Sequence, residues 1–221
     1  MKQLLSSCAK FAFRVANMNN DRPKRMPRGL LAGKRYIVNP CAQPGIYLCL
    51  YEYELQEHFY KLLKTGMRTF DIGSAMGFHA VGINNLTLSD VVCVEPNSAA
   101  RVRLRENLAA NGLSFPVVDA FIGAKTGPST TTIDKLSEDY FAPDFLKIDI
   151  EGGEYNALQG AEHVLAQHKP AMIIETHSVE LETNCADFLR KAGYKIRIVK
   201  QRRFMREGRS VAHNQWIVAQ P

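Results

Sequence analysis

The sequence has no long hydrophobic run. Its 221 residues contain no uninterrupted apolar stretch near the roughly 20 residues that a membrane-spanning helix needs. The opening segment, MKQLLSSCAKFAFRVANM, carries Lys10 and Arg14 where a secretory signal needs its apolar region. These two absences predict a cytoplasmic protein without a transmembrane segment.

The sequence also lacks the cysteine and histidine spacings of zinc sites and disulfide frameworks. Its five cysteines are scattered, with no CxxC pair and no histidine pair nearby. We therefore expect reduced, structural thiols. There are no internal repeats and no low-complexity tracts. A chain of this length then has room for one well-packed domain rather than two large ones.

Positive charge is concentrated toward the two ends of the chain. Residues 1–45 contain nine Lys or Arg and one acid, and residues 195–209 contain seven and one. Residues 46–194 contain twelve bases and twenty acids. The basic segments could hold a phosphorylated substrate, nucleic acid or an anionic membrane surface, or could simply be solvated.

The first part of the chain has a loop-like composition. Residues 17–45 are dense in Asn, Pro, Gly and Arg, which predicts a poorly packed arm with a short strand at 36–38 at most. We therefore divide the chain into a basic N-terminal arm, residues 1–44, and a globular domain, residues 45–221. An apolar stripe over residues 55–63 predicts that this domain begins with a helix.

Short apolar runs then alternate with amphipathic stretches. Strands are predicted at 69–72, 91–95, 115–118, 145–150, 172–175, 195–199 and 215–219, and helices at 78–86, 98–111, 155–168 and 179–192. Apolar strands separated by helices indicate an α/β fold whose parallel sheet has helices on both faces. The last two strands have no helix between them, so they should pair antiparallel. A mostly parallel seven-stranded sheet with an antiparallel edge strand resembles the Rossmann-like class I methyltransferases.

A glycine turn marks a ligand site at the end of the first predicted core strand. The segment FDIGSAMG places Gly73 and Gly77 where the backbone must turn sharply and approach a ligand. Glu95 ends the next strand, where a carboxylate can accept hydrogen bonds from ribose hydroxyls. Together they predict a cofactor that contains adenosine.

Two such cofactors fit this pattern, and the details favour S-adenosylmethionine over NAD. Asp71 would put negative charge where NAD places its pyrophosphate, whereas it suits a cationic sulfonium amino acid. The Tyr-xxx-Lys of short-chain dehydrogenases occurs only at Tyr60 and Lys64, ahead of the glycine turn. Asp119 could accept the adenine amino group or could be an exposed loop residue. The predicted cofactor-binding residues are Asp71, Gly73, Ser74, Gly77, Glu95 and Asp119.

Several segments together resemble one known family. They are LYEYE (50–54), FDIGSAMG, VEPN followed by ENLAANGL, LKIDIEGGE, IIETH (173–177) and NQWIVAQ. From residue 45 to 219 the chain resembles the FkbM family of S-adenosylmethionine-dependent methyltransferases. It departs from the family pattern at residues 74–76, where Ala-Asn-Ile is common, and at Gly153, where Ala is usual. The resemblance implies methyl transfer to a hydroxyl oxygen, often on a sugar or a polyketide-type product.

Carboxylates gather after two neighbouring strands of the predicted sheet. Asp149, Glu151 and Glu154 follow one strand, and Glu175 and His177 end or follow the next. Ligands of open parallel sheets bind beyond the carboxyl ends of the strands, so these groups should face one crevice. We therefore predict Asp149, Glu175, Glu151 and His177 as catalytic residues. Glu154 could instead serve only the first turn of the following helix, where a negative charge is favourable.

Two mechanisms remain open for ionising an acceptor hydroxyl. His177 or a carboxylate could remove the proton as a general base. Alternatively, Asp149 and Glu175, with Glu151 or Glu154, could hold Mg²⁺, which would lower the pKa of the hydroxyl. A set of carboxylates without Cys or paired His disfavours zinc. Lys147, unusual in mid-strand, could neutralise part of the acid cluster or contact substrate.

The predicted function is O-methyl transfer to a hydroxyl of a saccharide or small metabolite. A nucleic-acid or nucleotide ribose 2′-O-methyltransferase is the alternative, with the basic terminal segments following the phosphates. A scaffold protein that keeps the fold without catalysis would have no need for the four acids Asp71, Glu95, Asp149 and Glu175. The sequence does not reveal the oligomeric state.

Overall fold

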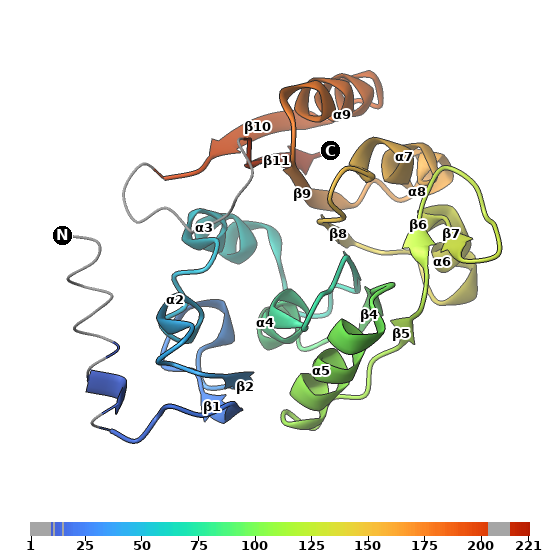
Figure 1. The fold of residues 1–221 in the computed structure, drawn as a ribbon. Coiled ribbons are helices and arrows are strands. Elements are labelled where there is room, and N and C mark those ends of the chain that lie inside the picture. Colours follow the sequence, from blue (N-terminus) through green and yellow to red (C-terminus); the bar gives the residue numbers. More distant parts are fainter. Residues whose placement is uncertain (1–9, 11, 15, 203–212) are drawn as a thin grey trace.

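The computed structural model describes residues 10, 12–14, 16–202 and 213–221. The first nine residues of the predicted basic arm, and residues 203–209 of the second basic segment, lie outside the described residues. The elements follow the order of Figure 1, with the sheet in the middle of the molecule. In the described residues no helix is long and apolar enough to cross a membrane.

The seven predicted strands form one sheet. They are β3 (Thr69–Ile72), β4 (Val91–Val94), β5 (Val117–Val118), β8 (Phe145–Ile148), β9 (Ala171–Thr176), β10 (Lys195–Lys200) and β11 (Gln215–Gln220). Their order across the sheet is β10-β11-β9-β8-β3-β4-β5. This confirms the α/β fold and the mostly parallel sheet.

The last two strands pair antiparallel at one edge of the sheet, as predicted, but the antiparallel strand is not the outermost one. The antiparallel strand is β11, and it pairs with β9 on one side and β10 on the other. The edge strand β10 therefore runs parallel to β9. The helix α9 (Val179–Lys191) carries the chain from β9 to the edge and leaves a gap, and β11 fills that gap from the end of the chain.

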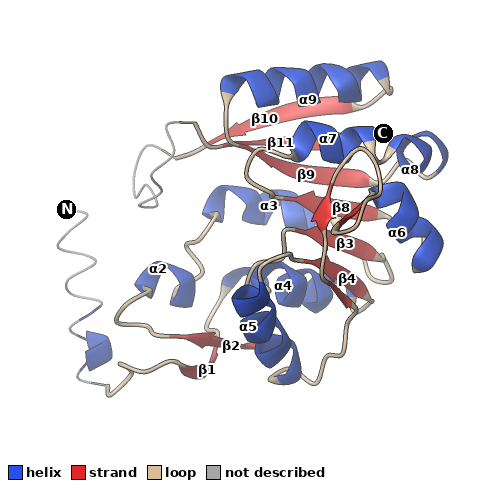
Figure 2. Cartoon of the chain, turned by 45° about the vertical axis from the view of Figure 1, so that its right-hand side comes forward, coloured by secondary structure: helices blue, strands red, loops and turns tan. Residues whose placement is uncertain are grey.

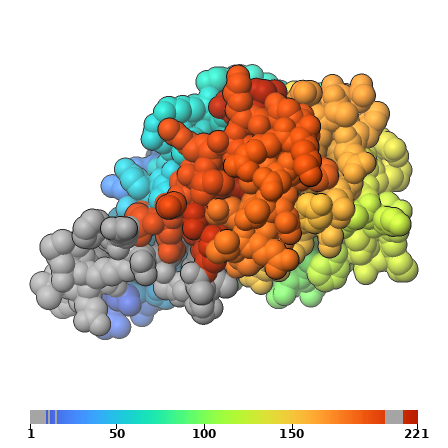
Figure 3. Space-filling model, turned by 90° about the horizontal axis from the view of Figure 1, so that it is seen from above, coloured from blue at the N-terminus to red at the C-terminus, as the bar shows by residue number. Residues whose placement is uncertain are grey.

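Helices cover both faces of the sheet, as Figure 2 shows. On one face α3 (Tyr53–Leu62), α4 (Phe78–Thr87) and α5 (Ser98–Ala109) contribute to one buried cluster. On the other face α6 (Ile133–Asp139), α7 (Glu154–Gln159), α8 (Glu162–Gln167) and α9 contribute to a second. Seen from above, α9 and β10 form the exposed surface, with α3 on one side and α7 and α8 on the other (Figure 3).

The single helix predicted over residues 155–168 is two helices, α7 and α8. A Cβ at Gly160, between them, would clash with the carbonyl oxygen of Gly123, so the chain touches another backbone there. Asp134 accepts hydrogen bonds from the backbone N–H groups of His163 and Val164 in the first turn of α8. These contacts interrupt the helix, and hydrophobic periodicity gives no sign of them.

The segment before residue 45 is more ordered than its composition suggests. It contains a hairpin of β1 (Arg22–Arg25) and β2 (Arg35–Val38), joined through the 3-10 turn η1 (Gly29–Leu31), and is followed by α2 (Pro44–Tyr47). Leu30 and Leu31 are buried against α4. The expectation of loose packing is therefore wrong for residues 26–38. The division of the chain at residue 45 stays a prediction.

One further pair of short strands, β6 (Phe121–Ile122) and β7 (Thr130–Thr131), follows β5. It lies beside α6 at one end of the sheet (Figure 1). The sequence predicts neither this pair nor α6, because two-residue strands leave no periodic pattern.

Candidate active site

Strand alternation puts the charged residues of the core strands on one face of the sheet. Asp71 of β3 lies directly opposite Lys147 of β8, and Lys147 lies opposite Ile173 of β9. Successive side chains of a strand point to opposite faces, so Asp149 and Glu175, two residues further along, share that face. Their apolar neighbours Phe70, Ile72, Leu146, Ile148 and Ile174 belong to the core on the other side. The strands therefore bring together Asp71, Lys147, Asp149 and Glu175.

His177 lies just past β9 with its two ring nitrogens in different surroundings. Nδ1 is 2.9 Å from Oε1 of Glu154, whose side chain is completely buried. Nε2 is 3.7 Å from Oδ1 of Asp149 and 3.8 Å from Oε1 of Glu175, beyond hydrogen-bonding distance. The hydrogen bond to Glu154, joined by the charges of Asp149 and Glu175, raises the pKa of His177 above its usual value despite partial burial.

Lys147 is the buried cation of this group of acids. Its side chain is 0% exposed, and Nζ lies 3.6 Å from Oδ2 of Asp149, which is 21% exposed. Burial would lower the pKa of Lys147, but the charges of Asp149, Glu52, Glu175 and Asp71 outweigh it, and the pKa is raised. The surrounding acids therefore favour the charged, ammonium form of Lys147.

A buried contact between Glu52 and His79 lies close to this group. Oε2 of Glu52 is 3.1 Å from Nε2 of His79 in α4, and both side chains are buried. Glu52 precedes α3 with a φ of 44°, a left-handed conformation that is uncommon for a residue with a side chain. Neither residue is predicted as part of the site, although Glu52 lies in the LYEYE segment. Their contact depends on how α3 packs against α4.

The glycine turn has the backbone conformation that its sequence predicts. Gly73 has a φ of 79° and Gly77 a φ of 84°, both strained for residues with side chains. A Cβ at Gly73 would clash with the carbonyl oxygen of Asp149. The turn therefore packs directly against the end of β8. Ser74 points back into the turn, where its hydroxyl donates to the carbonyl oxygen of Asp71 at 2.6 Å.

Glu95 ties the glycine turn to the start of α5. Oε2 accepts from the backbone N–H of Ala75 and Oε1 from that of Asn97, each at 2.8 Å. A carboxylate has about four acceptor positions, so these two bonds leave capacity for two hydroxyls. Glu95 therefore has acceptor positions left for ribose hydroxyls, and its role in cofactor binding stays a prediction.

Asp119 is in a different environment. Its side chain is 65% exposed, and Oδ2 lies 2.5 Å from the guanidinium of Arg101. Arg101 is itself held by the carbonyl oxygens of Glu95 and Pro96. The structure thus links Asp119 to Glu95 through one arginine, which the sequence does not predict.

Asp71 fits a cationic ligand group. It is almost completely buried, which raises the pKa of its carboxyl, although His79, Lys147 and Ser74 act in the opposite direction. Its Oδ2 has no hydrogen-bond partner within the described part of the chain. Buried carboxylate oxygens are normally paired, so this oxygen is suited to an ammonium or sulfonium ligand or to a bound water.

Of the two acids after Asp149, the structure brings Glu154 rather than Glu151 to the cluster. Glu151 is exposed on a turn, with a φ of 46°. Glu154 begins α7, as expected, but it also accepts from the backbone N–H of Gly152 and contacts His177. Sequence spacing does not predict which of Glu151 and Glu154 joins the cluster, because the conformation of the turn at 151–153 decides which side chain points inward.

The Mg²⁺ expectation receives a specific test from this geometry. Asp149, Glu175 and His177 can offer ligand atoms that all lie within 4.8 Å of one another. However, the ammonium of Lys147 already lies 3.6 Å from Asp149 and would repel a divalent ion bound there. The cluster therefore fits Mg²⁺ poorly, and the findings do not support Mg²⁺ as a cofactor.

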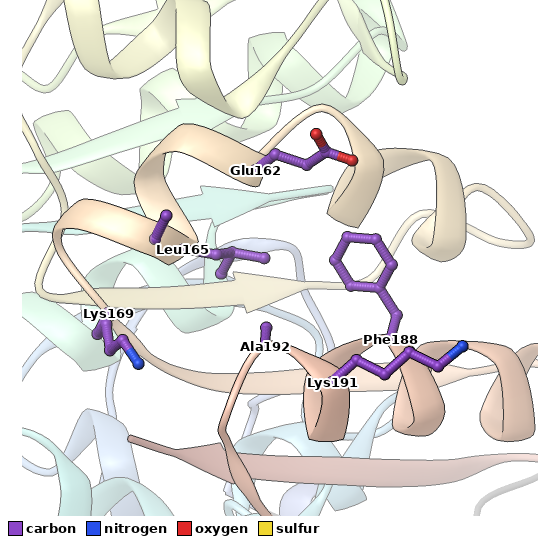
Figure 4. A pocket seen from close by; sticks show the side chains of 7 residues that line it. Glu162, Leu165, Lys169, Phe188, Lys191 and Ala192 are labelled. Carbon is purple, nitrogen blue, oxygen red and sulfur yellow. The ribbon is translucent and has the colours of Figure 1, made fainter.

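A surface pocket of about 460 Å³ lies well away from these residues. It is lined by side chains of α8, α9 and the turns after them, including Leu165, Lys169 and Phe188 (Figure 4). Since it contains none of the charged groups of the cluster, we do not connect it with the site.

Comparison with known proteins places this geometry in context. The sequence profile of the methyltransferase FkbM domain matches residues 38–196. No curated protein sequence is significantly similar to the chain. Among solved structures, methyltransferase FkbM from Methylobacillus flagellatus KT superposes with a TM-score of 0.57 and 18% identity, over 81% of this chain and 59% of that one.

Two other solved structures share this fold. Precorrin-6y C5,15-methyltransferase from Geobacter metallireducens has a TM-score of 0.54 and 20% identity, over 75% of this chain and 88% of that one. Aeropyrum pernix fibrillarin, solved with natively bound S-adenosyl-L-methionine, has a TM-score of 0.53 and 16% identity, over 72% and 68%. At these identities the likeness concerns the fold, not the acceptor.

The profile match spans well over half of the chain, and its residues include the glycine turn, Glu95 and the whole carboxylate cluster. S-adenosylmethionine is the methyl donor of these enzyme families. The chain therefore belongs to the FkbM family of methyltransferases.

Proposed function

We propose that this enzyme transfers a methyl group from S-adenosylmethionine to a hydroxyl oxygen of a saccharide or another small metabolite, with His177 as the general base. The observation that carries the proposal is the pairing of Nδ1 of His177 with the buried carboxylate of Glu154. A proton held on Nδ1 leaves Nε2 without one, so Nε2 can accept the proton of an acceptor hydroxyl.

The cofactor side of the proposal uses residues around the glycine turn. Glu95 has acceptor capacity for ribose hydroxyls, and Asp71 offers an unpaired buried oxygen for the cationic amino-acid part. Gly73, Ser74 and Gly77 shape the backbone between them. Asp119 would accept from the adenine amino group at the exposed side. When bound, S-adenosylmethionine supplies a methyl group on a positively charged sulfur, which makes the transfer intrinsically favourable.

On the acceptor side, the protein aligns the hydroxyl and removes its proton. With the donor bound, Nε2 of His177 would take the hydroxyl proton as the methyl group moves from the sulfonium sulfur to the hydroxyl oxygen. Asp149 and Glu175, each less than 4 Å from Nε2, stabilise the imidazolium that results and can accept hydrogen bonds from neighbouring hydroxyls. We assign no step to Glu151, since its side chain is exposed and outside the cluster.

A labelling experiment tests both the donor and the bond formed. The purified enzyme is incubated with methyl-labelled S-adenosylmethionine and a fractionated metabolite extract. We expect label in a saccharide or small-metabolite fraction as a methyl ether, which resists mild alkali, whereas a methyl ester would be released. His177→Gln should abolish incorporation. His163→Gln, on the exposed surface of α8, is the matched control and should incorporate normally. Incorporation by His177→Gln would rule out the proposed base.

One observation favours the second candidate, a nucleic-acid ribose 2′-O-methyltransferase. Arg22, Arg25, Arg28 and Arg35 of the N-terminal hairpin are exposed, and none pairs with a carboxylate in the described ranges. Exposed arginines without a carboxylate partner among the described residues suit phosphates. Label recovered in RNA as 2′-O-methylnucleoside, with binding that weakens steeply as salt rises, would favour this candidate over the small-molecule acceptor.

A further inference from the structure

Lys147 stands out among the buried charged groups because it is completely enclosed. Lysine side chains are almost never fully buried unless they are paired with a negative charge. The ion-pair partner of Lys147 is Oδ2 of Asp149, which lies 3.6 Å from Nζ. Nζ has no hydrogen-bond partner among the described residues. Its environment is therefore one of several surrounding negative charges rather than one tight salt bridge.

These charges come from four separate parts of the fold. Asp149 follows β8, Glu52 precedes α3, Glu175 ends β9 and Asp71 lies in β3, and all four favour the charged form of Lys147. One cation surrounded by carboxylates from several elements is the arrangement that usually surrounds a hard metal ion. Here the positive charge is supplied by a side chain of the protein.

Lys147 is also fixed in position by the sheet. It pairs in register with Asp71 of β3 and Ile173 of β9, in the middle of the seven strands. The backbone therefore cannot move the ammonium away from the carboxylates without breaking the central ladder. A divalent ion bound to Asp149 would lie close to this immobile positive charge and be repelled by it.

We propose that the ammonium of Lys147 is the resident cation of the carboxylate cluster and takes the place of a divalent metal. Lys147 is then a positioning residue, which holds the side chain of Asp149 beside Nε2 of His177 and balances the charges of Asp149 and Glu175. The consequence for methyl transfer rests on the proposed function, whereas the consequence for metal binding does not.

The direct test is a titration of the whole protein with Mn²⁺. Binding is measured by calorimetry and by the loss of the electron paramagnetic resonance signal of free Mn²⁺. The wild-type enzyme should show no saturable Mn²⁺ binding in the millimolar range. Lys147→Met, which removes the charge and keeps the bulk, should bind Mn²⁺ saturably, at least about tenfold more tightly than the millimolar limit set for the wild type. This new binding should disappear when Asp149→Asn is added.

The matched control is Lys135→Met. Lys135 also contacts two carboxylates, at 2.7 Å for Asp139 and 3.3 Å for Glu138, but on the exposed side of α6. The Lys135→Met variant should bind Mn²⁺ no better than the wild type. Equal Mn²⁺ affinity in the Lys147 and Lys135 variants would overturn the proposal.

Measurements on the wild type keep the proposal testable if Lys147→Met does not fold. Saturable Mn²⁺ binding by the wild type that Asp149→Asn removes would overturn it, as would methyl transfer that is lost on chelation and restored by Mg²⁺. Lys147→Gln, smaller and neutral, provides a second variant with the same expected gain of Mn²⁺ binding. Because the titrations need no acceptor, their result is independent of whether the acceptor class above is right.

Discussion

Oε1 of Glu154 and Nδ1 of His177 lie 2.9 Å apart, although the two residues are on different elements of the chain. Glu154 begins α7 after β8, and His177 follows β9. A buried carboxylate against one ring nitrogen fixes the orientation of the imidazole and leaves the other nitrogen facing Asp149 and Glu175. The orientation of the proposed base therefore depends on a residue whose side chain is completely buried.

Replacing Glu154 should move the pH dependence of turnover. Its hydrogen bond is the largest cause of the raised pKa of His177, so Glu154→Gln should lower that pKa. The acid limb of kcat/KM, which we expect above about pH 6.5 in the wild type, should shift to lower pH. The maximal rate should decrease about tenfold or more, because the ring loses its fixed orientation. An unchanged acid limb would contradict the assignment of His177 as base.

The same raised pKa predicts how stability depends on pH. A histidine whose pKa is higher in the folded state stabilises the protein in its charged form. The stabilisation by His177 should be complete below about pH 6.5, the unfolded value, and should be lost as pH rises through the folded-state pKa. Urea denaturation of wild type and His177→Gln at several pH values measures it. The difference between them should shrink toward alkaline pH, and a difference that grows would be inconsistent with the raised pKa.

Gly66 and Gly73 have similar backbone conformations, so alanine substitutions at the two positions distinguish the cost of backbone strain from the cost of a steric clash. Gly66 has a φ of 88°, and a Cβ added there would meet no atom within 4 Å, whereas Gly73 has a φ of 79° and a Cβ there would clash with a backbone oxygen. Gly66→Ala should cost only the left-handed strain, about 1–2 kcal/mol of unfolding free energy. Gly73→Ala should cost more and should also weaken S-adenosylmethionine binding. Thermal denaturation and calorimetry with the cofactor check both, and equal effects would mean that the contact is not tight.

The two acids predicted to contact the adenosine part of the cofactor, Glu95 and Asp119, should contribute unequally. Glu95→Ala removes a nearly buried carboxylate and should weaken S-adenosylmethionine binding by about tenfold or more, as expected for charge-assisted hydrogen bonds. Asp119→Ala removes an exposed, Arg101-paired carboxylate and should change affinity by less than about threefold. Isothermal titration calorimetry measures both. An effect at Asp119 as large as that at Glu95 would contradict this ranking of the two acids.

The N-terminal hairpin should contribute to the stability of the whole domain. Leu30 is buried against α4, where a Cβ at Gly82 would clash with its Cγ. Leu30→Ala should lower the unfolding free energy by about 2–5 kcal/mol, in a single cooperative transition. Arg28→Ala, exposed two residues earlier, is the control and should be within about 0.5 kcal/mol of wild type. A separate early transition would indicate that the hairpin folds apart from the sheet.

Periodicity alone predicts most of the sheet, because its strands are apolar and separated by amphipathic helices. It also places Asp71, Glu95, Asp149 and Glu175 at strand ends, where the carboxyl edge of a parallel sheet collects ligand groups. It does not predict that β11 lies inside the edge, since the order of strands depends on a long connection rather than on local pattern.

The local sequence pattern also does not predict which of the neighbouring acids contacts His177. Glu151 and Glu154 are three residues apart, and only the turn after β8 decides that Glu154 meets His177 while Glu151 faces solvent. Glu52 and His79 are 27 residues apart and become a pair only through the packing of α3 on α4.

The amino-acid order by itself determined the family, the parallel sheet, the glycine turn and the presence of acids at the ends of two strands, because these depend on local composition and on the two-residue period of a strand. Only the tertiary structure decided which charges meet. Burial removes water from Lys147, Asp71 and Glu154, so their partners must come from other elements, and those partners are set by packing rather than by spacing along the chain.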